Sequence, residues 1–210
     1  SGEPGRKKVV RDLLGRVIEV ASGMAFDEFL HKRIFEPAGM TSTWFTVPAS
    51  EVGRFTTNYG IMNGTPIPMD PAKASIYLDK PPFPFGGAGL VSSPRDYDRF
   101  LKMLLGYGVI EGKRVMGELA VRVGTSNLLP ETATTEGTWV EGQGFGAGGR
   151  VTDGSYGWGG AAGTVAFVNY KAGLRANLMT QYMPSDSYPI HEGFPEAVTA
   201  DLAAMQGAKA

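Results

Sequence analysis

Apolar residues recur at helical spacing in four parts of the chain. This pattern predicts amphipathic helices over Val9–Ala21, Phe26–Phe35, Pro94–Leu105 and Pro195–Met205. Gly23 and Pro37 follow the first two helices and are expected to end them, because glycine suits the left-handed position after a helix and proline does not continue one.

The helix over Pro94–Leu105 has the clearest boundaries. Ser93 can cap its first turn, Pro94 suits the first helical position, and Asp96 completes a Ser-x-x-Asp capping box. Gly106 is expected to close it. The residues predicted to be buried along it are Tyr97, Phe100, Leu101, Leu104 and Leu105.

Two other segments give weaker patterns. A short helix is expected near Gly117–Val123. The stretch Ala38–Phe85 is rich in proline and is predicted to be irregular, and so long a loop in a compact domain is usually functional. In the terminal helix, the residues expected to face inward are Ala197, Val198, Leu202 and Met205.

Strands are predicted in the last third of the chain. Gly142–Val151 leads into Ser155–Ala162, Thr164–Tyr170 and Leu174–Gln181, which form an antiparallel meander with turns at Gly163 and at residues 170–173. The three glycines Gly157, Gly159 and Gly160 weaken a strand unless something approaches its backbone closely. The alternative is a bulged edge strand lying against a helix.

The strands follow one another instead of alternating with helices, which predicts an α+β fold, an antiparallel sheet covered by helices. We expect a single partial domain over residues 1–210. Residues 1–140 would be mainly helices and long loops, and residues 141–210 would be antiparallel strands and a C-terminal helix.

Composition excludes several classes of function. The chain has 20 basic and 21 acidic residues with no basic stripe, so nucleic acid is not expected as a partner. No apolar run is long enough to span a bilayer. No signal peptide opens the chain, which favours a cytoplasmic location without fixing it.

Cofactor and metal chemistry are not expected. There are no cysteines, and His31 and His191 are interpreted as solvated or capping residues, so no metal site is predicted. Gly142-x-Gly144-x-x-Ala147 lacks the strand–turn–helix context of a dinucleotide site, so no cofactor is expected.

The chain offers no activated nucleophile of its own. In Asp153-Gly-Ser-Tyr-Gly157 the first glycine of a nucleophile elbow is replaced by aspartate, and no helix follows. No Ser-x-x-Lys occurs anywhere.

Five segments, in this order and spacing, resemble serine β-lactamase-like proteins, which include class C β-lactamases, penicillin-binding proteins and family VIII carboxylesterases. The segments are Glu3–Gly5, Asp12–Gly23, Phe26–Met40, Gly86–Ser93 and Tyr156–Gly163. The resemblance implies the C-terminal part of the β-lactamase/transpeptidase-like fold. Trp158-Gly159-Gly160 stands where β-lactamases carry Lys-Thr-Gly, a replacement typical of the esterase branch.

The resemblance also implies site residues. The backbone N–H of Ala161 would be one oxyanion-hole donor, the other coming from the nucleophilic serine. Trp158, Gly159 and Gly160 would border the substrate, with Trp158 as an apolar wall or, alternatively, a core tryptophan. The residues implied to line the acyl pocket are Gly86, Gly87 and Ala88.

The family's Ser-x-x-Lys nucleophile and its catalytic tyrosine have no counterpart here, and residues 6–11 hold no tyrosine. The resemblance therefore implies a serine hydrolase that cleaves small-molecule carboxylic esters through an acyl-enzyme, with β-lactams as weaker substrates. The chain itself is expected to be an incomplete or inactive portion. The alternatives are a non-catalytic binding or scaffold protein, or one half of a split enzyme. Association with the missing N-terminal half or with itself is expected.

Overall fold

The centre of the molecule is a five-stranded antiparallel sheet. The computed structural model describes residues 4–207, and side chains from Asp12 to Met205. The strands lie in the order in which the chain presents them. They are β5 (Gly144–Phe145), β6 (Arg150–Thr152), β7 (Ser155–Gly160), β8 (Thr164–Asn169) and β9 (Leu174–Leu178). The predicted meander and the α+β class are confirmed.

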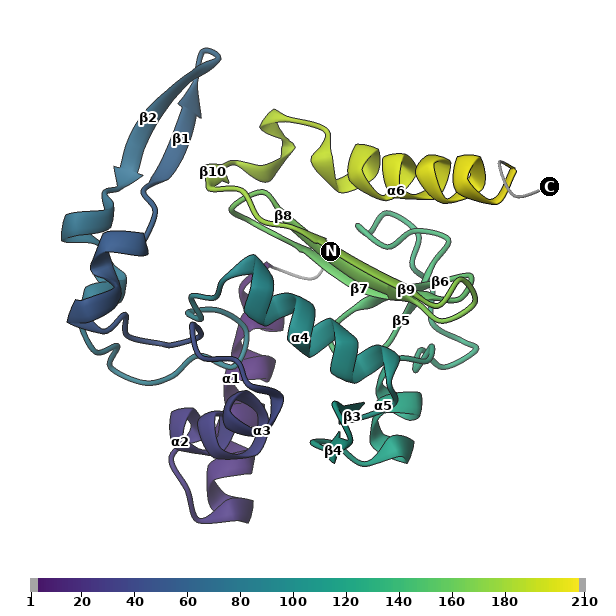
Figure 1. Ribbon diagram of the computed structural model, residues 1–210, viewed down its shortest axis with the longest axis horizontal. Helices are drawn as coiled ribbons and strands as arrows, with labels where there is room; N and C mark the ends of the chain where they lie inside the picture. Colours follow the sequence, from purple (N-terminus) through teal and green to yellow (C-terminus); the bar gives the residue numbers. More distant parts are fainter. Residues whose placement is uncertain (1–3, 208–210) are drawn as a thin grey trace.

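Two helices cover opposite faces of this sheet (Figure 1). Helix α4 (Pro94–Leu105) packs on β8 and β9, and helix α6 (Ile190–Gly207) packs on the other face against β8. A bidentate ion pair between Arg175 on β9 and Asp98 on α4, at 2.7 and 3.0 Å, ties the first helix to the sheet.

Helix α4 begins and ends where the sequence predicts. The Ser93 hydroxyl accepts a hydrogen bond from the Asp96 N–H at 3.1 Å, which satisfies one free donor of the first turn. The Asp96 carboxylate serves a different purpose from the expected capping box. It is buried and accepts hydrogen bonds from the Ser42 N–H at 2.6 Å and the Thr43 hydroxyl at 2.9 Å.

The hydrophobic core lies between α4, the sheet and the preceding helices. Leu101 and Leu104 are buried as predicted, and Met103, which the predicted stripe omits, is fully buried as well. Ala166 and Val168 supply the sheet side of the core. Tyr97, Phe100 and Leu105 are partly buried against it.

The first helices differ from their predicted extents. Helix α1 spans Pro4–Ser22 and α2 spans Phe26–Leu30, followed by a π-helical turn (His31–Phe35) and α3 (Glu36–Ala38). Pro37 lies inside this helical run, in the first turn of α3. Proline is tolerated there, because a backbone N–H in the first turn of a helix has no partner within that helix. Gly39 ends the run in the left-handed conformation, at φ 69°.

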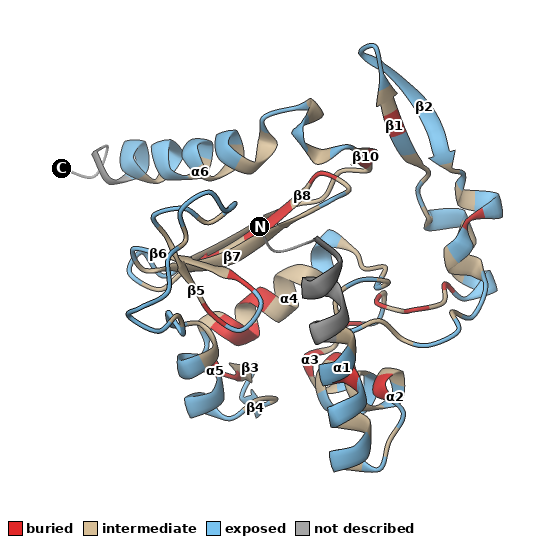
Figure 2. Ribbon diagram, turned by 180° about the vertical axis from the view of Figure 1, so that it is seen from behind, coloured by how far each residue is buried: buried red, intermediate tan, exposed pale blue. Residues whose placement is uncertain are grey.

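The apolar side chains of α1 are mostly outward-facing. Leu13, Leu14, Val17 and Val20 are exposed. The expected positions Val9 and Val10 lie outside the described side chains. The amphipathic pattern thus indicates the helix correctly, but its apolar face has no covering element among the described residues (Figure 2).

The stretch Ala38–Phe85 is not wholly irregular, which corrects the prediction. It contains a hairpin of β1 (Asn58–Met62) and β2 (Thr65–Asp70), and β1 also pairs in parallel with β10 (Tyr182–Met183). The two-residue turn is Asn63-Gly64, both with positive φ, which is a strong hairpin pattern. The same stretch also contains short 3₁₀ helices at Ala49–Arg54, Ala72–Ala74 and Ile76–Leu78, and a further one follows β10 at Ser185–Ser187.

The terminal helix begins five residues before the predicted start. His191 lies in its first turn instead of in a loop, and Pro195 is inside it. Phe194, Val198 and Leu202 are half-buried, whereas the predicted inward residues Ala197 and Met205 are exposed. The remaining elements are β3 (Val109–Ile110), β4 (Lys113–Arg114) and α5 (Glu118–Gly124). Helix α5 confirms the short helix predicted near Gly117–Val123.

No helix within residues 4–207 is long and apolar enough to cross a membrane.

Candidate functional site

Strand β7 changes its pairing halfway along. It pairs with β8 over its whole length, from Ser155↔Asn169 to Gly160↔Thr164. Its other edge pairs with β6 only over Ser155–Gly157. Among the residues that the structure describes, the stretch Trp158–Gly160 therefore has one unpaired backbone edge. The alternative of a bulged edge strand is met only in part, because this half of β7 is an edge but its register with β8 is continuous and shows no bulge.

Two of the β7 glycines are explained by packing. A Cβ on Gly157 would overlap the Ala166 carbonyl oxygen and lie 2.6 Å from the Phe167 Cβ, which no rotamer change can relieve. A Cβ on Gly159 would lie 2.8 Å from the His191 Nε2. His191 from α6 lies against β7 and β8, with Nε2 3.0 Å from the Thr164 carbonyl oxygen, which corrects its interpretation as a solvated or capping residue.

Gly160 differs from these two glycines. A Cβ there would overlap only the Thr164 Oγ1, and the Thr164 Cβ would be 3.6 Å away. The crowding is thus with the end of one side chain and not with backbone. Packing against backbone explains the absence of a side chain at Gly157, whereas Gly159 and Gly160 are each crowded by one side chain, a ring at Gly159 and a hydroxyl at Gly160.

Ala161 follows β7 directly and is exposed at the start of the turn to β8. The turn is closed by the Gly163 N–H, which donates to the Gly160 carbonyl at 3.1 Å. No residue of the described chain accepts a hydrogen bond from the Ala161 N–H. The exposed residue Ala161 thus carries a backbone N–H that has no acceptor among the described residues and that can donate to an incoming oxygen.

Trp158 is half-buried and not a core residue. Its ring meets Phe145 of β5 edge to face, with centroids 5.6 Å apart. This contact fixes the indole beside the unpaired edge, with apolar surface still exposed.

Gly86, Gly87 and Ala88 lie in the loop before α4, and Asp12 of α1 holds this loop. The Asp12 carboxylate accepts hydrogen bonds from the Gly86 N–H at 3.0 Å and the Gly87 N–H at 3.4 Å. Residues 74 positions apart are thereby joined. Asp12 thus holds the loop through backbone N–H groups, so Gly87 and Ala88 remain free to line a surface.

That surface is a pocket of about 320 Å³, called the Asp12 pocket below. Gly87 and Ala88 line it together with Asp12 and Asp79. Its apolar walls come from Phe45, Ile76, Tyr77, Pro81 and Phe85.

The wall that carries Ile76 and Tyr77 is fixed by hydrogen bonds. The Asp70 carboxylate accepts from the Ser75 hydroxyl at 2.6 Å and the Ile76 N–H at 3.2 Å. Burial raises the pKa of the Tyr77 phenol, and the Asp70 charge adds to the rise. Tyr77 therefore stays neutral at pH 7 and is a wall, not a base.

The two groups of sequence-predicted residues do not line one pocket. Gly87 and Ala88 line the Asp12 pocket. Gly86, predicted with them, does not line it, and neither do the residues of the second group, which are Trp158, Gly159, Gly160 and Ala161. Sequence reasoning also missed Asp12, Phe45 and Tyr77 as pocket residues. Only a contact over 74 positions gives Asp12 its role, and no local pattern indicates such a contact. Among the described residues there is no group of acidic, histidine or cysteine side chains that could hold a metal.

A family model and a curated relative each match most of this chain. The sequence profile described as Beta-lactamase matches residues 10–198. Protein Rv1367c of Mycobacterium tuberculosis strain H37Rv is 30% identical over 192 residues, which cover 82% of this chain and 47% of that protein. The chain thus spans about half the length of the curated relatives it matches.

Solved structures share the fold. A mutant of simvastatin synthase from Aspergillus terreus matches 92% of this chain and 55% of its own, with 19% identity and a TM-score of 0.75. EstCE1, described as a hydrolase with promiscuous acyltransferase activity, matches 81% of this chain and 49% of its own, with 23% identity and a TM-score of 0.66. The profile match extends over most of the sequence, and the chain therefore belongs to the β-lactamase family.

Proposed function

We propose that this chain forms the oxyanion and acyl-binding part of a serine hydrolase that cleaves carboxylic esters through an acyl-enzyme. The observation that carries the proposal is the free Ala161 N–H at the end of the unpaired edge Trp158–Gly160. A backbone donor stabilises a developing oxyanion only if the carbonyl can come within hydrogen-bonding distance, and the bare strand allows that approach.

Trp158 supports esters over β-lactams as the main substrates. An indole offers apolar surface and no positive charge at the position where β-lactamases carry a lysine. The structural neighbour EstCE1, described as a hydrolase with promiscuous acyltransferase activity, supports the same class of reaction.

The nucleophile of the proposed enzyme is not in this chain, because no Ser-x-x-Lys occurs in it. The same observation favours a second candidate, a binding or scaffold protein that keeps the pocket without the chemistry. It equally fits a split enzyme whose other chain supplies the serine.

The first test measures hydrolysis of p-nitrophenyl butyrate. We expect no activity above background from the purified 210-residue chain, and activity from a longer product of the same gene that includes a Ser-x-x-Lys. Intact mass and N-terminal sequencing of the native protein decide which product exists. A fluorophosphonate should label a serine outside this chain.

Two results would contradict the proposal. Activity of the 210-residue chain that is abolished by fluorophosphonate on one of its own serines would overturn the site assignment. A native product with no Ser-x-x-Lys and no partner chain would favour the scaffold.

A further inference from the structure

The turn between β7 and β8 decides where the Ala161 N–H points. The peptide plane that carries this N–H also carries the Gly160 carbonyl, and the two groups point in opposite directions across a trans peptide. The Gly160 carbonyl accepts from the Gly163 N–H at 3.1 Å, and Gly163 is in the left-handed conformation at φ 71°. A three-residue turn that ends in a left-handed residue is a common hairpin connection. The direction of the Ala161 N–H therefore depends on how firmly Gly163 is held.

Thr180, in the segment after β9, contacts this turn directly. Its hydroxyl donates to the Gly163 carbonyl at 2.5 Å, and the same oxygen lies 3.3 Å from the Ala162 carbonyl oxygen. A Cβ on Gly163 would overlap the Thr180 Oγ1, so the hydroxyl lies against the backbone of the turn. Thr180 is 17 positions from Gly163, and no local sequence pattern indicates this contact.

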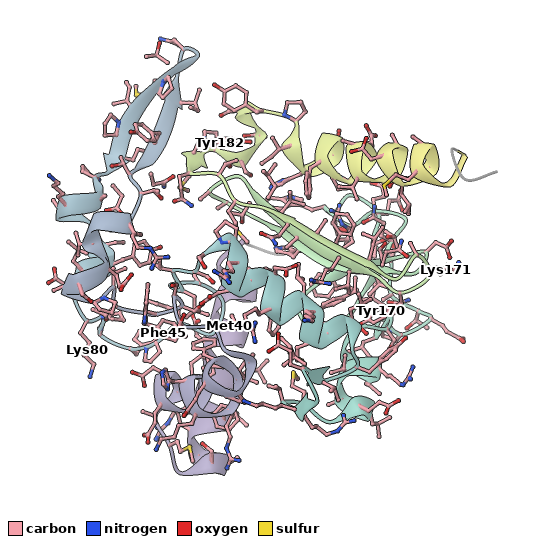
Figure 3. The ribbon with its side chains drawn as sticks, viewed as in Figure 1. Met40, Phe45, Lys80, Tyr170, Lys171 and Tyr182 are labelled. Carbon is pink, nitrogen blue, oxygen red and sulfur yellow. The ribbon has the colours of Figure 1, made fainter. Side chains whose placement is uncertain are left out.

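Strand β10 supports the same turn. The Tyr182 N–H donates to the Ala162 carbonyl at 3.3 Å, and the Tyr182 ring would also overlap a Cβ on Gly163. Tyr182 is buried, and its ring meets that of Tyr188 edge to face, with centroids 5.0 Å apart. Figure 3 shows Tyr182 between the β1–β2 hairpin and the start of α6. These contacts fix β10 and, with it, the position of Thr180 two residues earlier.

Two further contacts hold the surroundings of the turn. The Tyr59 N–H of β1 donates to the Gln181 carbonyl at 3.0 Å, which ties the β1–β2 hairpin to the residue after Thr180. On β8, the Thr164 carbonyl lies 3.0 Å from the His191 Nε2, and because a carbonyl only accepts, Nε2 is the donor. Among these contacts, that of Thr180 comes from a side-chain hydroxyl that one substitution removes and another retains.

We propose that Thr180 is a positioning residue for ester cleavage, because its hydroxyl fixes Gly163 and thereby the direction of the Ala161 N–H. The inference rests on the proposed function, since it takes this N–H as an oxyanion donor. A donor held in place beforehand stabilises the developing negative charge without reorganising during the reaction. Loss of the Thr180 hydroxyl keeps the donor in the chain but frees its direction. The effect therefore belongs to the transition state and should fall on kcat more than on KM.

The first test uses the 210-residue chain and needs no nucleophile. Thr180→Val removes the hydroxyl and keeps the branched shape, whereas Thr180→Ser keeps the hydroxyl. Hydrogen exchange followed by NMR measures the opening of the turn at the Gly163 amide. The amide of Val168, a fully buried residue of β8, reports the opening of the whole sheet. In Thr180→Val we expect exchange at Gly163 to accelerate at least about fivefold more than at Val168, and in Thr180→Ser to accelerate equally little at both.

The second test measures hydrolysis of p-nitrophenyl butyrate by the longer product that includes a Ser-x-x-Lys. We expect Thr180→Val to lower kcat about tenfold while KM changes less than about twofold, and Thr180→Ser to keep kcat within about twofold of the wild type. The matched control is Thr125→Val. The Thr125 hydroxyl also donates to a backbone carbonyl, that of Val121 at 2.8 Å, and Thr125 and Thr180 are both half-buried. Thr125→Val should leave kcat and KM unchanged, even where it lowers the melting temperature.

Three outcomes overturn the inference while the proposed function stands. One is an active longer enzyme whose kcat is unchanged by Thr180→Val. Another is a loss of kcat that Thr180→Ser shares or that Thr125→Val reproduces, because a general loss of stability would then explain it. The third is exchange at Gly163 that stays in step with exchange at Val168. A longer product without esterase activity is a different result, since it removes the proposed function and the oxyanion role of Thr180 with it, whatever the exchange rates.

Discussion

At the scale of single residues, the most informative side chain is that of Asp96, because its partners in the structure differ from the one that the sequence predicts. Asp96 occupies the third position of α4, where a capping carboxylate is expected to bond back to the helix start. It is 4% exposed and instead binds the Ser42 N–H and the Thr43 hydroxyl. The residue type and position follow from local sequence, but its partners, more than 50 positions away, do not.

This geometry makes Asp96 a stability residue. Asp96→Ala would leave the Ser42 N–H without an acceptor, whereas the Thr43 hydroxyl keeps its second partner, the Ser92 hydroxyl at 2.8 Å, so the free energy of unfolding should fall by about 2 kcal/mol. Asp96→Asn retains an acceptor oxygen and should lose less. Urea denaturation followed by circular dichroism measures both.

The matched control is Asp153→Ala. Its carboxylate pairs with Lys171, and the Asp153 side chain is 87% exposed, so the expected loss is below about 0.5 kcal/mol. Equal losses for Asp96→Ala and Asp153→Ala would show that the buried hydrogen bonds of Asp96 contribute little.

At the scale of elements, the sequence pattern predicts those helices and strands whose formation depends on local chemistry. The Ser93 cap fixes α4, and apolar alternation with glycine turns fixes β7–β9. The β1–β2 hairpin is missed because Pro66 and Pro68 indicate a loop, although prolines are tolerated on β2, whose second edge is unpaired. The Asn63-Gly64 turn is the pattern that would have revealed it.

Helix α6 shows a different limit of local prediction. Pro195 resembles a helix start, but the helix begins at Ile190 because His191 and Phe194 pack on the sheet, where His191 meets the Thr164 carbonyl and Phe194 meets Phe167. Tertiary packing here outweighs the cost of an internal proline. The glycines of β7 are explained in the same way, since Gly159 accommodates the His191 ring.

The oxyanion assignment of β7 gives a prediction for the longer enzyme. Gly160→Val should crowd the approach of the acyl carbonyl to the Ala161 N–H and lower turnover by about a hundredfold. The added side chain would also meet Thr164 Oγ1, so the variant is made with Thr164→Ala and compared with Thr164→Ala alone. Trp158→Phe should change substrate preference more than turnover, because it reshapes a wall and removes no donor.

Turnover and melting temperature are measured for all of these variants. If Gly160→Val with Thr164→Ala keeps the turnover and the melting temperature of Thr164→Ala, the oxyanion role of this strand is wrong. The glycine at position 160 would then serve packing, as those at Gly157 and Gly159 do.

At the scale of the whole molecule, the sequence predicts both parts of the candidate site but not their separation. The loop Gly86–Ala88 and the strand Trp158–Gly160 follow from one family resemblance, yet only Gly87 and Ala88 of these residues line the Asp12 pocket. Which residues complete a pocket depends on contacts such as that of Asp12 with the Gly86 N–H, and these arise only in the folded chain.

The last prediction concerns two surfaces without a partner in the described chain. Strand β9 pairs on one side only, with β8, and so presents an open edge. On α1, Leu13, Val17 and Val20 lie on one face and are 54–71% exposed. An open edge and an exposed apolar stripe both favour association.

We therefore expect the purified chain to bind the dye ANS and to associate as its concentration rises, which light scattering measures. Val17→Glu with Val20→Lys should reduce both effects without lowering the melting temperature, since these side chains are already exposed. The control Leu119→Lys, an exposed position on α5 that belongs to neither surface, should leave both unchanged. A chain that stays monomeric over a wide concentration range and binds no dye would mean that neither surface needs a partner, and the expected association with a further half would lose its physical basis.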